Sequence, residues 1–138
     1  MNEPLIRTIQ ILAWAFFAVI VFATLTHVGF ANSMYYAVAP WLLRPQMKAY
    51  ALFEHVMAFA VLGAAFTLAY PRRALLVCGL VFGAAITLEY LQTLTPDRHG
   101  TLIDALEKLV GGAIGVLAAR AFLHLAKKAR TGASEGGT

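Results

Sequence analysis

The chain has 138 residues, of which 60% are hydrophobic and 13% are charged, whereas soluble domains carry about 45–50% apolar and about 25% charged residues. No charged residue occurs between Arg7 and Arg44, or between Arg73 and Glu89. A water-soluble fold needs charged helix faces, so this composition excludes a soluble enzyme, a nucleic-acid-binding protein and a disordered chain. We expect the formal net charge of +4 to set membrane topology.

Four apolar segments are long enough to cross a bilayer, which takes roughly 20 mostly apolar residues. Each is predicted to be a helix, because backbone groups in hydrocarbon must be hydrogen-bonded within their own segment. The expected fold is therefore an all-α membrane protein with one domain over residues 1–126. A basic, then Gly- and Ser-rich cytoplasmic tail over 127–138 is expected to be frayed. The predicted spans are 9–26, 49–70, 74–94 and 102–125.

The connection between the first two spans, residues 30–48, is the longest in the chain. It contains Tyr35, Tyr36 and Trp41, whose amphipathic rings suit the headgroup layer of a membrane. We expect a short interfacial segment here, lying along the outer surface.

The distribution of Lys and Arg predicts the orientation of the chain. Six basic residues lie beside the N-terminus, the loop between spans two and three and the tail, whereas three lie on the opposite side. Both termini are therefore expected in the cytoplasm and the protein in the cytoplasmic (inner) membrane. The six are Arg7, Arg72, Arg73, Lys127, Lys128 and Arg130, and the three are Arg44, Lys48 and Arg98.

Ionisable residues inside the predicted spans are functional candidates, because an unpaired charge in a membrane costs several kcal/mol. With the predicted topology, all of them fall at one depth, the outer third of the membrane. They come from the start of the second span, the end of the third and the start of the fourth. The set is Glu54, His55, Glu89, Asp104, Glu107 and Lys108, with the amide of Gln92 alongside and Arg98 in the adjoining loop.

Helical spacing places several of these residues on common faces, since positions three or four apart are neighbours. Glu89 and Gln92 project together. Asp104 and Lys108 continue into the glycines at 111 and 115 as one stripe, which predicts close packing against another helix. The small-residue pairs Gly111/Gly115 and Gly79/Gly83 are both expected to be helix-packing contacts.

The ordered pattern of these residues resembles the VanZ-like family. The resemblance covers roughly residues 54–119. The residues that resemble the C-terminal signature of that family are Glu89-x-x-Gln92, Pro96-Asp97-Arg98, Thr101-x-x-Asp104, then Gly111 and Gly115. The pattern His55-x-x-x-Phe59-x-x-x-Gly63 is similar to that family's second-helix motif.

Two positions depart from the pattern of that family. Where the family often has an acid–Lys pair before the histidine, this chain has Ala51 and Leu52, and Glu54 is the nearest acid. Where the family often has Asn after the aspartate, this chain has Lys108. A lysine at that position changes the charge of the site.

The resemblance implies a small multi-pass bacterial membrane protein, since the family's namesake is associated with resistance to the glycopeptide antibiotic teicoplanin at the cell envelope. We expect the chain to bind or modify a lipid-linked or anionic envelope component at the outer face of the membrane, with no nucleic-acid partner. Arg98 would offer a donor fork to phosphate or carboxylate, and Lys108 a point charge. Gln92, Asp104 and Glu54 complete the predicted ligand-binding set.

Two other functions remain open at this stage. An intramembrane enzyme acting on a lipid headgroup would use Glu89 and His55 as base and acid. A structural subunit of an envelope-synthesis complex would use the segment 30–48 as its contact surface.

A purely structural interpretation stands beside these functions. The acids would be neutralised by Arg98, Lys108 and His55, with Gln92 completing the hydrogen bonds, and the network would only fix helix packing. No cofactor is expected. No metal is expected either, because His55 and His99 lack a metal-ligand spacing.

Overall fold

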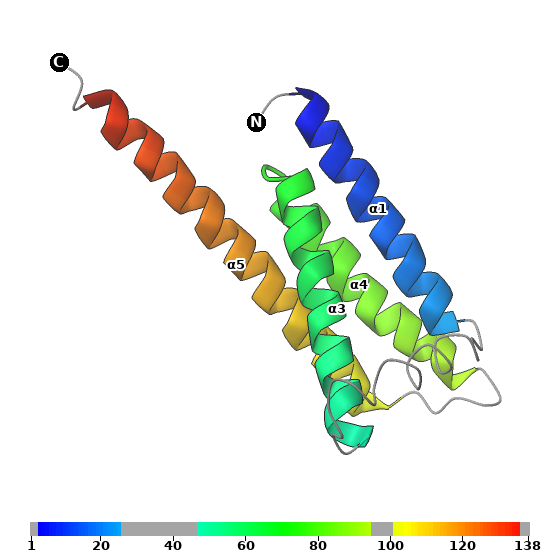
Figure 1. Cartoon of the computed structure of the whole chain (residues 1–138). Helices are drawn as coiled ribbons and strands as arrows, with labels where there is room; N and C mark the ends of the chain where they lie inside the picture. The colour runs from blue at the N-terminus through cyan, green and yellow to red at the C-terminus, as the bar shows by residue number, and fades with distance from the viewer. Residues whose placement is uncertain (1–2, 26–46, 95–100, 136–138) are drawn as a thin grey trace, which may run out of the picture.

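The computed structural model describes residues 3–25, 47–94 and 101–135. Within these ranges the chain forms helices and no strand. The helices are α1 (Glu3–Leu25), α3 (Met47–Ala69), α4 (Ala74–Thr93) and α5 (Leu102–Glu135) (Figure 1). All four are long and apolar enough to cross a membrane, which confirms the predicted all-α membrane fold. The predicted interfacial segment lies almost wholly outside the described residues.

Two helices extend further than the sequence pattern indicated. Helix α1 begins at Glu3 rather than at residue 9, because Glu3 suits the positive N-terminal end of a helix and Pro4 is tolerated in its first turn. Helix α5 continues to Glu135, so residues 127–135 of the predicted tail are helical. Lys and Ala favour the helix there, and Thr131 Oγ1 donates to the carbonyl of Lys128 at 2.9 Å.

The helices form a bundle in which α3 contacts α1, α4 and α5, and α4 contacts both α1 and α5 (Figure 1). The beginning of α1 and the end of α5 lie at one end of the bundle. At the opposite end, α3 begins, α4 ends and α5 begins. Between α1 and α3, Trp14 meets Phe66 edge-on, with ring centroids 5.2 Å apart.

The closest helix contact joins α3 and α5, and it depends on glycine. A Cβ atom at Gly111 would overlap the backbone of Val56, and one at Gly115 would overlap the backbone of Ala60. These glycines therefore let two backbones approach, as small residues do in membrane helices.

Gly79 and Gly83 differ from this pair. A Cβ at either position would meet nothing within 4 Å. Among the described residues, neither glycine makes the close helix contact that its spacing suggested. The physical reason is that both lie beside an open groove between α1 and α4, lined by Phe17, Val21, Leu25, Gly79, Leu80, Gly83, Ala84, Thr87, Leu88 and Leu91.

Gly115→Ala is expected to lower the free energy of unfolding by about 1–3 kcal/mol, the usual cost of overpacking, because its Cβ meets backbone that cannot rotate away. Gly83→Ala is the matched control and should be neutral or slightly stabilising, since the added Cβ enters open space and alanine favours helix. Thermal unfolding of the purified protein in detergent, followed by circular dichroism, measures both. Equal stability of the two variants would contradict the tight α3–α5 contact.

Candidate functional site

Polar side chains from three helices meet where α3 begins, α4 ends and α5 begins. They form two groups with different surroundings. The first is a buried network of Glu89, Gln92 and Lys108. The second is a half-exposed cluster of His55, Asp104 and Glu107.

In the buried network, Lys108 is the centre. Its side chain is 2% exposed, and its ammonium forms an ion pair with Glu89 and donates to Gln92 Oε1 at 3.1 Å. Glu89 also accepts a hydrogen bond from the backbone N–H of Thr101 at 2.7 Å. Gln92 Nε2 in turn donates to the carbonyl of Thr24 in α1 at 3.4 Å. The network therefore joins three helices.

This network pairs one positive with one negative side chain, and each of its buried polar atoms has a hydrogen-bond partner. Across the part of the chain that the structure describes, no buried side-chain nitrogen or oxygen lacks a partner. Such pairing is needed because a lone charge in a low-dielectric interior is strongly unfavourable. The ammonium of Lys108 is thus already engaged by Glu89 and Gln92, as in the structural interpretation of the sequence.

Thr101 explains why α5 begins where it does. Its Oγ1 accepts the backbone N–H of Asp104 at 3.1 Å, which is the hydrogen bond of an N-cap residue and satisfies one donor of the first turn. The backbone N–H of the same threonine binds Glu89 of α4. One residue therefore caps α5 and ties it to α4.

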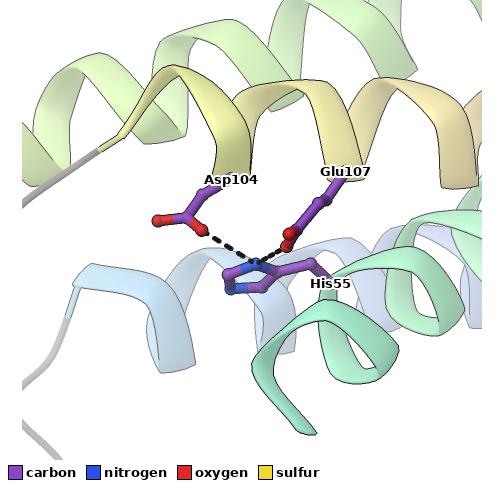
Figure 2. A group of neighbouring side chains, drawn as sticks. All are labelled: His55, Asp104 and Glu107. Carbon is purple, nitrogen blue, oxygen red and sulfur yellow. Dashed lines mark hydrogen bonds and ion pairs between the residues drawn. The ribbon is translucent and has the colours of Figure 1, made fainter. Parts of the chain in front are cut away.

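In the half-exposed cluster, two carboxylates of α5 face one imidazole of α3 (Figure 2). His55 Nδ1 lies 3.1 Å from Glu107 Oε2 and 3.9 Å from Asp104 Oδ1. The side chains of His55, Asp104 and Glu107 are 27%, 29% and 13% exposed. Solvent or a ligand can therefore reach this cluster, in contrast to the buried network.

A groove of about 340 Å³ lies between α4 and the start of α5. Its lining is mostly apolar, and Glu89 contributes the charged group. Ile86, Tyr90 and Leu102 are each more than half exposed, so the groove is open along the side of the bundle. Its lining residues are Ile86, Glu89, Tyr90, Thr93, Thr101, Leu102 and Ala105.

Two predicted site residues, Glu54 and Arg98, belong to neither of these groups in the described structure. Glu54 is exposed on α3. Arg98 lies outside the described residues, as do Tyr35, Tyr36 and Trp41 of the suggested partner surface.

The sequence placed Glu107 among the ionisable candidates but outside the predicted ligand-binding and catalytic sets, and the structure pairs it with His55. The spacing of His55 and His99 indicates no metal site, and His99 lies outside the described residues. The donor atoms that do converge come from two helices, with Asp104 and Glu107 three positions apart on one helical face. That i, i+3 spacing was the available signal.

The fold and the site together define a multi-pass helical membrane protein with a polar centre near one end of its bundle. Comparison with protein-family models, with curated proteins and with solved structures finds no match to this chain. The function of this protein is therefore inferred from the geometry of its polar centre.

Lys108→Met should destabilise the protein by about 3–5 kcal/mol, the usual cost of leaving one member of a buried ion pair alone. The double variant Lys108→Met/Glu89→Gln should recover most of this loss, because it removes both charges. Arg120→Met is the matched control on an exposed face of α5 and should stay within about 0.5 kcal/mol of the wild type. Thermal and denaturant unfolding in detergent measure all three. A double variant no more stable than Lys108→Met would show that the two charges are not coupled.

Proposed function

We propose that this protein binds a lipid-linked component of the bacterial cell envelope in the groove between α4 and α5, at the outer face of the cytoplasmic membrane. The observation that carries the proposal is the groove itself. It combines an apolar wall open to the side of the bundle with a polar end formed by Glu89 and the two threonines. This combination suits an amphiphile and not a water-soluble metabolite.

The apolar part of the ligand would lie along Ile86, Tyr90, Leu102 and Ala105. It would enter from the bilayer without crossing an aqueous phase, because Ile86 and Tyr90 are 57% and 64% exposed within the apolar helix α4. Transfer of a hydrocarbon chain between two apolar surroundings yields little free energy. The wall of the groove therefore orients the ligand, and specificity resides in the polar end.

The polar end favours a headgroup that offers hydroxyl or amide hydrogens. Glu89 is an acceptor whose charge is compensated by Lys108, and a threonine hydroxyl such as that of Thr101 both donates and accepts. Sugar and peptide groups of envelope precursors have this chemistry. Recognition of an anionic phosphate, by contrast, would fall to Arg98, the predicted donor fork.

Two sequence features support the placement at the outer face of the inner membrane. The basic residues Arg72 and Arg73 lie in the turn between α3 and α4, at the end of the bundle away from the polar centre, which the positive-inside rule assigns to the cytoplasm. The resemblance to the VanZ-like motif pattern favours the same placement at the cell envelope. A role in tolerance to glycopeptides such as teicoplanin would follow from binding an envelope precursor.

Ala105→Phe is expected to fill the groove and remove a co-purifying lipid. Native mass spectrometry of protein extracted from bacterial membranes should show the bound fraction falling about tenfold, which corresponds to roughly 1.4 kcal/mol of binding. Ala118→Phe is the matched control, because Ala118 is exposed on the same helix away from the groove, and it should retain the wild-type adduct. Equal loss in both variants, or no adduct in the wild type, would contradict binding in the groove.

Arg98→Gln tests the anionic part of the proposal by the same measurement. Retention of phosphate-bearing lipids should fall while neutral lipids are kept, because glutamine cannot form the charged bidentate contact of arginine. Unchanged retention of phosphate-bearing lipids would remove Arg98 from the binding site.

A second candidate function, modification of a lipid headgroup at the cluster of His55 and Glu107 and not in the groove, is favoured by one contact. Glu107 Oε2 lies 3.1 Å from His55 Nδ1, within hydrogen-bond distance. A carboxylate in this position orients a histidine for proton transfer. In this alternative His55 is the acid or base and Glu107 positions it. Glu89, the other residue predicted for this role, is engaged by Lys108 and by the N–H of Thr101.

If proton transfer by His55 drives such a reaction, His55→Gln should lower turnover of a labelled lipid-linked precursor by about 10²–10⁴-fold. Turnover is followed by thin-layer chromatography after reconstitution into phospholipid vesicles. The adduct seen by mass spectrometry should persist, and His124→Gln, an exposed histidine far along α5, should leave turnover unchanged. Turnover that survives in His55→Gln would leave binding as the function.

A further inference from the structure

The half-exposed cluster of His55, Asp104 and Glu107 brings three metal-ligating side chains together. Each offers one donor atom, and these atoms all lie within 4.8 Å of one another. Both carboxylates point at the same edge of the imidazole (Figure 2). Small rotations of these side chains would bring all three donors onto one metal ion, whereas a proton on Nδ1 is shared with one carboxylate at a time.

The charge balance of the cluster favours a cation. Two carboxylates face one imidazole, whose Nδ1 can carry one hydrogen and satisfy one of them, at 3.1 Å for Glu107 and 3.9 Å for Asp104. The neighbouring Lys108 neutralises Glu89 and not these acids. Negative charge near the apolar part of a membrane is costly, and a divalent ion would compensate both carboxylates together.

The helix framework holds the donors in place. Asp104 and Glu107 are three residues apart on α5, so they share one face of the helix. His55 stands opposite on α3, one residue before Val56, whose backbone packs against Gly111 of α5. Because this contact leaves no room for a side chain, the distance between the two helices is fixed close to the cluster.

The donor set and its exposure define the class of ion. An imidazole with two carboxylates suits zinc and the neighbouring first-row metals rather than magnesium or calcium, which prefer oxygen donors alone. Three protein ligands leave a further coordination position free, and the exposure of 13–29% for these side chains leaves water access to it. Sites of this composition bind a water or a substrate group at the open position.

We propose that His55, Asp104 and Glu107 form a binding site for a divalent transition metal, with Zn²⁺ as the ion to be tested. His55 binds through Nδ1 and each acid through one carboxylate oxygen. This site is separate from the groove between α4 and α5, and it stands whether or not a lipid binds there.

The test uses the full chain, purified with a tag free of histidine and kept in detergent or lipid nanodiscs. Competition against a chromogenic chelator should give one Zn²⁺ per chain, and Co²⁺ should produce visible absorption bands. His55→Gln and Glu107→Gln should each weaken binding by more than the roughly 10–100-fold typical of losing an outer-shell partner. Asp104→Asn should weaken it too while leaving the His55–Glu107 contact in place.

Matched controls remove similar groups elsewhere. Glu3→Gln on α1 and His124→Gln on α5, both at exposed positions, should bind Zn²⁺ as the wild type does. Zn²⁺ should also raise the unfolding temperature of the wild type and of these controls, because an ion that binds only the folded state stabilises it. The unfolding temperature of Asp104→Asn should stay nearly unchanged when Zn²⁺ is added.

The proposal fails if the wild type shows no stoichiometric Zn²⁺, no Co²⁺ absorption and no thermal shift. It fails equally if the three cluster variants bind as tightly as Glu3→Gln and His124→Gln. Neither result bears on the groove, because Ala105→Phe and Ala118→Phe report on that site by mass spectrometry.

Discussion

The cost of a charge in a membrane-spanning bundle governs the polar centre of this protein. Lys108 is almost completely buried, and an ammonium there persists only with an anion and further hydrogen-bond acceptors beside it. Glu89 and Gln92 supply these from α4. Because Glu89 also holds the backbone N–H of Thr101, this single requirement joins the end of α4 to the start of α5 and, through Gln92, to α1.

Once Lys108 is committed to Glu89, the other acids of α5 need a different counterpart. Asp104 and Glu107 face His55 on α3, and this second cluster is the one that solvent reaches. The polar centre thus divides into a neutral part that holds helices together and a carboxylate-rich part with spare coordinating capacity. Because Lys108 is already paired with Glu89, it is poorly suited to bind an anionic ligand. Because two carboxylates face one imidazole in the exposed cluster, we propose a cation as its ligand.

The glycines of α5 determine how near the half-exposed cluster's two carboxylates come to α3. Gly111 and Gly115 bring the backbone of α5 against Val56 and Ala60, which places His55 within reach of the acids one to two turns earlier on α5. On its other side, α5 leaves the groove along α4 open. One helix therefore presents the cluster proposed to bind a metal toward α3 and the groove proposed to bind an amphiphile toward α4.

The sequence by itself determined the fold class, the four helices and the layer of polar residues, because an apolar segment of this length must be helical in a membrane and charges must sit where they can be paired. The stripe from Asp104 to Gly115 likewise follows from helical periodicity. Tertiary structure alone decided which charges pair, that Gly111 and Gly115 meet a helix whereas Gly79 and Gly83 do not, and that His55 faces two carboxylates. Spacing describes one helix at a time, while these contacts depend on how helices rotate and cross.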